Sequence, residues 1–157
     1  MKLVLIQVGK TDDNYLAEGL SVFYSRIRKM IPLEVISVKE SKESKSKPES
    51  VLKKEEADAI SSRFKQGDII ILLDERGEQM NSRNFASYIQ KIMNSGPRRL
   101  VFVTGGAWGL CEDLTSRADR MVSLSSMTFS HQLVRLLFAE QLYRALTIIK
   151  GIPYHHD

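Results

Sequence analysis

Residues 69–73 read Ile-Ile-Ile-Leu-Leu, and this short run constrains the fold more than any other part of the chain. A strand that faces water on one side alternates apolar and polar residues, but this run contains no polar position. Such a pattern is typical of a parallel strand that helices cover on both faces. We therefore expect residues 69–73 to form a central strand of an α/β sheet.

The rest of the chain alternates between strand patterns and helix patterns. This alternation predicts a single α/β domain over residues 1–157, with a mostly parallel sheet flanked by helices. Further strands are predicted over Leu3–Val8, Leu33–Val38, Leu100–Thr104 and Met121–Leu124. Helices are predicted after the capping residues Thr11–Asp13, over about Glu49–Phe64, from Asn81 or Ser82, and over about His131–Lys150.

Apolar residues recur at helical spacing in the predicted helices, and each set is expected to face the core. These sets are Leu16, Leu20, Phe23 and Ile27; Leu52, Ala59, Ile60 and Phe64; and Phe85, Tyr88, Ile89, Ile92 and Met93. The last helix is apolar over more than one stripe, so it must be buried on several sides. One sheet covers one side, and a second copy of the chain is a suitable cover for another, which predicts a homodimer.

Composition narrows the class of protein and its partners. With 43% hydrophobic residues the chain can bury a core without disulfides, and a buried structural role is expected for its single cysteine, Cys111. The first apolar run, Leu3 to Ile6, is shorter than a signal peptide requires, and no run is long enough to span a bilayer. We therefore expect a cytoplasmic protein without a membrane segment.

The net charge is +4 and the isoelectric point is about 9.2, which favours a polyanionic partner. Residues 39–54 contain six lysines and three glutamates. This tract is interpreted equally well as a solvated loop and as a contact to an RNA backbone.

Three loops follow the predicted inner strands, and ligands of open α/β sheets bind at this edge. The loops are Leu73–Gly77, Thr104–Gly109 and Leu124–Phe129. Gly105 and Gly106 permit a close backbone approach to a ligand or a positive φ, although two glycines alone form a plain turn more often than a site. The third loop combines apolar and hydroxyl side chains, which suits an adenosyl ligand as well as core packing.

Other chemistries have little support in the sequence. His131 stands alone and His155–Asp157 form a terminal segment, so no metal site is predicted. No nucleophile elbow occurs, which argues against hydrolase chemistry, and no phosphate-binding loop occurs, which argues against an enzyme that acts on a small nucleotide. Glu140 and Arg144 have the spacing of an ordinary surface ion pair on a helix.

The carboxyl-terminal third nevertheless resembles a known family. The run Ser123–His131, continuing through Arg135 and Glu140–Ala145 to Gly151–His155, is similar to the signature of the RlmH (YbeA-like) family of SPOUT methyltransferases. The opening Met1–Leu3, the Leu73–Asp74 turn and Gly105–Gly106 also fit, so the resemblance covers the full chain. One departure is that His156 and Asp157 follow His155, where the family commonly has Arg or Lys.

The resemblance implies a SPOUT fold with a C-terminal trefoil knot, and a homodimer that methylates N3 of a pseudouridine in 23S rRNA on the assembled ribosome. The implied cofactor is S-adenosylmethionine, bound by Leu73, Gly105, Leu124, Ser125, Ser126, Met127, Thr128 and Phe129. Tyr154 and His155 are expected to approach the target base, with His155 as candidate proton acceptor or phosphate contact, and Glu140 and Arg144 to orient the tail or the RNA. A noncatalytic ribosome-associated RNA-binding protein is the main alternative, and an enzyme acting on a small nucleotide is a weaker one.

Overall fold

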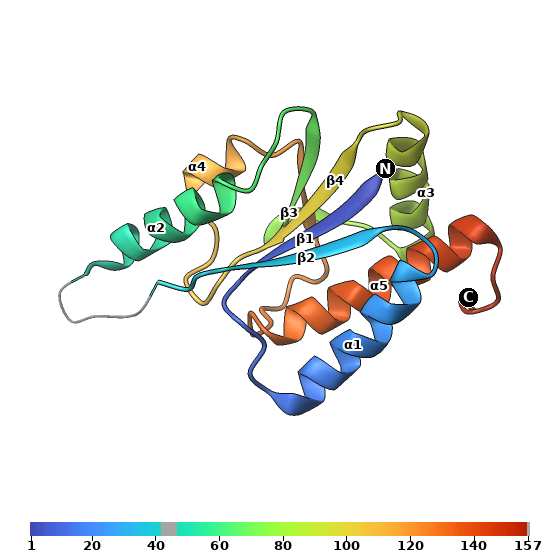
Figure 1. The fold of residues 1–157 in the computed structure, drawn as a ribbon, viewed down its shortest axis with the longest axis horizontal. Coiled ribbons are helices and arrows are strands. Elements are labelled where there is room, and N and C mark those ends of the chain that lie inside the picture. Colours follow the sequence, from blue (N-terminus) through green and yellow to red (C-terminus); the bar gives the residue numbers. More distant parts are fainter. Residues whose placement is uncertain (42–46, 157) are drawn as a thin grey trace.

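The computed structural model describes residues 1–41 and 47–156 (Figure 1). Within these residues five strands form one sheet in the order β2-β1-β4-β3-β5, and every neighbouring pair is parallel. The predicted α/β class and parallel sheet are confirmed. The strands are β1 (Lys2–Val8), β2 (Leu33–Val38), β3 (Asp68–Gln79), β4 (Arg99–Thr104) and β5 (Arg120–Ser123).

The apolar run at residues 69–73 lies inside the sheet, as predicted. Strand β3 pairs with β4 on one side and β5 on the other, and Ile70–Leu73 are buried. The strand is longer than the prediction, because it continues through polar residues to Gln79. Its register with β5 shifts between Leu73 and Glu78, so residues 74–77 interrupt the regular pairing of the two strands.

Helices cover both faces of the sheet (Figure 1). On one face lie α1 (Asn14–Arg28), α3 (Ser82–Asn94) and α5 (Leu133–Lys150), and on the other lie α2 (Glu49–Ser61) and the short α4 (Glu112–Thr115). Each face has its own apolar core. No helix of the described residues is long and apolar enough to cross a membrane.

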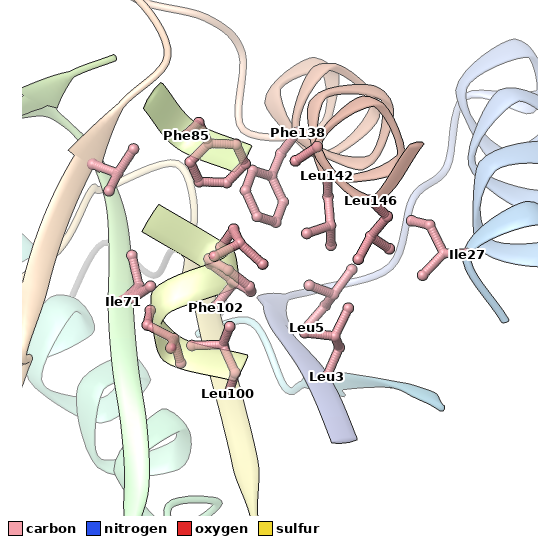
Figure 2. Close-up of a cluster of buried hydrophobic side chains, with 14 of the residues drawn as sticks. Leu3, Leu5, Ile27, Ile71, Phe85, Leu100, Phe102, Phe138, Leu142 and Leu146 are labelled. Atoms are coloured by element: carbon pink, nitrogen blue, oxygen red, sulfur yellow. The ribbon is translucent and has the colours of Figure 1, made fainter. Parts of the chain in front are cut away.

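Helix α5 is the centre of the larger core. Phe138 packs against Phe102 of β4 with ring centroids 4.8 Å apart, and Leu142 and Leu146 extend the same face (Figure 2). Helix α1 approaches α5 closely, since a β-carbon on Gly19 would lie 2.9 Å from Leu136. The prediction that this helix is buried on several sides is confirmed within one chain, because α1, α3 and the sheet all contact it.

Several predicted boundaries and core positions were wrong. The second helix ends at Ser61 and not at Phe64, since residues 62–63 form a turn in which Ser62 bonds back to the Ala59 carbonyl. Ala59 and Phe64 are half-buried, and the inward position is taken by Ala57. The last helix begins at Leu133, two residues later than expected, and the fifth strand spans residues 120–123 rather than 121–124. Phe23, Tyr88 and Met93 are only half-buried, as is the Cys111 thiol.

Two local predictions concern the ends of helices. Asn81 caps α3, with its side chain accepting a hydrogen bond from the Asn84 amide at 2.8 Å, as predicted. Asp13 takes the N-cap position of α1, but no side-chain capping bond is formed there. The short α4 was not predicted, because four residues are too few to show a helical period.

Candidate functional site

A cavity of about 570 Å³ opens at the carboxyl ends of β3, β4 and β5. Its volume lies within the range of small-molecule pockets. The three loops that the sequence singled out converge here, and the chain just before α5 closes one side. The wall is formed by Lys53, Leu73–Arg76, Gly105–Leu110, Val122, Leu124, Ser125, Met127–His131 and Val134.

Seven of the eight predicted cofactor residues line this cavity. They are Leu73, Gly105, Leu124, Ser125, Met127, Thr128 and Phe129. Ser126 is exposed and lies outside the wall, so its role in binding stays a prediction. Apolar side chains and hydroxyl groups are mixed along the wall, which provides both a surface for a flat ring and hydrogen-bonding groups for a ribose or amino acid.

The positive φ that was considered for the two glycines of the second loop is absent, and their close approach to a ligand stays a prediction. Neither Gly105 nor Gly106 has a positive φ, whereas Gly109 does, at +76°. A β-carbon on Gly106 would lie 2.7 Å from a Glu56 carboxylate oxygen, and one on Gly105 would lie 3.2 Å from the carbonyl carbon of Gly109. The protein's own atoms therefore leave little room for a side chain at either position, and the loop lines the cavity.

Charged side chains surround the mouth of the cavity. Asp74 and Arg76 form an ion pair with a nitrogen–oxygen distance of 2.8 Å, and this hydrogen bond lowers the pKa of the Asp74 carboxyl. The Thr128 hydroxyl donates to the Glu75 carboxylate at 2.7 Å. This second contact joins the loop after β3 to the loop after β5, so the two walls meet at the mouth.

The loop after β5 is shaped by its own serines. Ser123 donates its hydroxyl to the Ser125 carbonyl at 2.8 Å, and the Met127 amide donates to the Ser125 hydroxyl at 2.9 Å. These bonds hold a tight backbone turn, so that short polar residues replace regular structure here. The Met127 side chain is 73% exposed although its residue lines the cavity.

The four predicted catalytic residues form one cluster, in which the C-terminal tail contacts the middle of α5. A Glu140 carboxylate oxygen accepts from Arg144 Nε at 3.1 Å and from the Tyr154 hydroxyl at 3.0 Å. Arg144 Nη1 lies 3.3 Å from His155 Nδ1, and its guanidinium lies 4.8 Å from the Tyr154 ring centre. Burial, followed by the bond to Glu140, raises the pKa of Tyr154. Glu140 and Arg144 therefore form the ion pair that their spacing predicted, and both also contact the C-terminal tail.

This cluster lies outside the wall of the first cavity. Glu140 and Arg144 line a second cavity of about 470 Å³, together with apolar residues of α1 and α5. Tyr154 and His155 line neither cavity. The two cavities share three wall residues, Val122, Leu124 and Phe129, so one layer of side chains separates them.

Some wall residues were missed by the sequence. Lys53 of α2, Leu110, His131 and Val134 line the cavity without having been predicted. The helical spacing of Val134 could have indicated that the first turn of α5 follows the third loop into the site. Among the described residues no group of three or more metal-ligating side chains occurs.

An open parallel sheet with a cavity where its strand-end loops converge defines the class of α/β proteins whose ligand sites lie at that edge. Comparison with known proteins is more specific. Residues 1–155 match the family described as "Predicted SPOUT methyltransferase". The chain belongs to the SPOUT methyltransferase family.

Similar curated proteins span the whole chain. Proteins named "Ribosomal RNA large subunit methyltransferase H" from Christiangramia forsetii and Cytophaga hutchinsonii are 45% and 47% identical, over 99% of this chain and 99% and 100% of their own lengths. The Parabacteroides distasonis protein of that name is 42% identical over the full length of both. The resemblance that the C-terminal motif indicated is confirmed. A solved "Probable Methyltransferase" from Bordetella pertussis has a TM-score of 0.55 at 15% identity, with 92% of this chain and 93% of that one covered, which supports the fold.

Proposed function

We propose that the chain transfers a methyl group from S-adenosylmethionine to N3 of a pseudouridine in 23S rRNA, on the assembled ribosome in the cytoplasm. The convergence of three strand-end loops around a cavity of about 570 Å³ is the observation that carries the proposal. The names of the full-length relatives support an rRNA substrate. The proposal takes residues 1–157 as one SPOUT methyltransferase domain, since both apolar cores lie against the same sheet.

The residues of the cavity fit S-adenosylmethionine. Leu73, Leu124 and Phe129 offer apolar surface for the adenine ring, and Ser125 and Thr128 offer hydroxyls. Two carboxylates, Asp74 and Glu75, lie at the wall, where they suit the positive charge of the ammonium and sulfonium groups. When bound, the cofactor supplies an electrophilic methyl group.

The chain must then position N3 and let its proton leave. Glu140 and Arg144 would hold Tyr154 and His155 near the target base, beside the donor cavity. Arginine can only donate, so its contact at 3.3 Å makes His155 Nδ1 an acceptor and places the ring hydrogen of neutral histidine on Nε2. For Nδ1 to accept the proton of N3, the Arg144 contact must open.

A homodimer is part of the proposal. Phe23 of α1 with Leu136 and Leu137 of α5 leave apolar surface around the second cavity, and Val22 of α1 is 47% exposed. A second copy that covers this surface would bring its own residues next to Glu140 and Arg144. Sedimentation at micromolar concentration checks this part, and a monodisperse monomer would contradict it. The trefoil knot implied by the family resemblance stays a prediction.

The test is calorimetric titration of the full chain with S-adenosylmethionine, followed by mass mapping of methyl groups on ribosomes that lack the modification. Ser125→Ala should weaken donor binding because it removes the acceptor of the Met127 amide. The matched control is Ser126→Ala. Ser126 lies outside the wall, so loss of its hydroxyl should leave donor binding unchanged. No binding of the donor, with normal binding to ribosomes, would favour the noncatalytic RNA-binding alternative.

A further inference from the structure

Arg135 is a buried cation in the first turns of α5, with 2% of its surface exposed. Its Nη1 donates to the Lys10 carbonyl at 2.9 Å and to the Thr11 hydroxyl at 3.0 Å, and its Nη2 donates to the Val8 carbonyl. All three acceptors lie at the end of β1 or just after it. Arg135 therefore fastens the β1–α1 connection to α5 across more than 120 residues of sequence.

These bonds leave one polar atom of Arg135 without a partner. Its Nε is buried and makes no hydrogen bond within the part of the chain that the structure describes, and the same holds for the hydroxyl of Thr104. Thr104 is the last residue of β4 and is 7% exposed. Buried polar groups are almost always hydrogen-bonded, because leaving one unpaired loses its bond to water without replacement.

Arg135 and Thr104 lie on the wall of the same small cavity, which has a volume of about 10 Å³. This is about the space that one water molecule needs. Gln7 of β1 and Tyr24 of α1 contribute two further polar residues to the wall, and the rest is apolar. Burial raises the pKa of Tyr24 to about 12, so its phenol stays protonated and able to donate.

We propose that this cavity is a binding site for one structural water molecule, which accepts a hydrogen bond from Arg135 Nε and bonds to the Thr104 hydroxyl. The site supplies the two to four polar partners that a buried water requires. The water extends the hydrogen bonds of Arg135 to the end of β4, immediately before Gly105 of the candidate site. The β1–α1 connection, α5 and the glycine loop would then share one buried network.

Thr104→Val tests the site, because the two alternatives predict opposite signs. If the hydroxyl has no partner, replacing it by a methyl group removes a buried polar atom that makes no hydrogen bond, and the melting temperature rises. If a water joins it to Arg135, the substitution removes one partner of the water, and loss of the water then leaves Nε without a hydrogen bond. We then expect the melting temperature of the full chain to fall by roughly 3 °C.

A crystal structure at a resolution that shows ordered water supplies the second measurement. We expect density within hydrogen-bonding distance of Arg135 Nε and of Thr104 Oγ in the parent protein. Thr104→Ser, which keeps the hydroxyl, should keep this density, and Thr104→Val should lose it. A dry cavity in the parent, or a melting temperature that rises or stays the same in Thr104→Val, would overturn the proposal. Neither readout depends on methyl transfer.

Discussion

Thr128 and Glu75 join two loops that lie 53 residues apart in sequence, through a hydrogen bond of 2.7 Å at the mouth of the donor-sized cavity. Both side chains are exposed, so the bond contributes about 1 kcal/mol at most. We expect Thr128→Val to speed dissociation of S-adenosylmethionine about five-fold, since the two walls would separate more easily. Stopped-flow dissociation measures this effect. Thr128→Ser keeps the hydroxyl and serves as control; equal rates in both variants would show that the bond has no role.

Gly77 lies against the backbone of the neighbouring strand. A β-carbon there would be 2.6 Å from the Val122 nitrogen and 2.7 Å from the Met121 carbonyl carbon, and neither atom can move without disturbing the β3–β5 pairing. We expect Gly77→Ala to lower the free energy of unfolding by about 3 kcal/mol. Urea denaturation measures the loss.

Gly67→Ala is the matched control for the backbone effect alone. Gly67 has a φ of +80° and nothing lies within 4 Å of the place that a β-carbon would take, so the cost should be about 1 kcal/mol. Equal losses in the two variants would mean that the crowding at Gly77 relaxes at little cost.

Tyr154 holds the C-terminal tail to α5 through its bond to Glu140. Removing the hydroxyl in Tyr154→Phe should cost about 1 kcal/mol, which corresponds to roughly a five-fold larger population of detached tail. Hydrogen exchange of residues 152–156 reports this population, and methylation of ribosomes should fall with it. Tyr15→Phe, at a side chain that is 67% exposed, controls for loss of a phenol elsewhere. Unchanged exchange in Tyr154→Phe would contradict the tail contact.

Glu56 is 3% exposed behind the glycine loop, and burial raises the pKa of its carboxyl from 4.5. The Glu40 carboxylate adds to this rise, while the hydrogen bond from the Ser41 amide opposes it. The folded chain therefore keeps this proton at pH values where the unfolded chain has lost it, so Glu56 makes folding less favourable as the pH rises above about 4.5.

Glu56→Gln removes this titration. The variant should gain stability relative to the parent as the pH rises above 4.5, and the difference should shrink below pH 4.5. Thermal unfolding at a series of pH values measures the gap between the two proteins. A gap that does not change with pH would show that Glu56 keeps its ordinary pKa in the fold.

The parts of the fold that depend on apolar pattern could be predicted from sequence. Ile70–Leu73 are buried on both faces, and the five consecutive apolar residues 69–73 predicted this burial. The extension of β3 to Gln79 could not be predicted, because its residues are polar and their pairing depends on β5, which comes more than 40 residues later. The crowding at Gly106 could not be predicted for a similar reason, because the nearest atom belongs to Glu56, 50 residues earlier in the sequence.

The site was predictable to the extent that it follows strand ends. Leu73, Gly105 and Leu124 each follow or end a predicted strand, and all three line the cavity. Lys53 lies on a helix from the other side of the sheet, and no sequence pattern points it toward the cavity. The structure describes only part of the lysine tract. Lys47 and Lys53 form ion pairs with glutamates, and Lys42 and Lys45 lie outside the described residues. Asp157 also lies outside them.

A single continuous helix carries both Val134, on the wall of the first cavity, and Arg144, which holds the tail. Ten residues of α-helix correspond to a separation of about 15 Å along the axis, and each added residue turns the far end by about 100°. The length of α5 therefore fixes the distance between the wall of the first cavity and the cluster that holds the tail. Inserting one alanine between these positions would turn the end of α5 that carries Arg144 by about 100° relative to Val134, and the tail would turn with it.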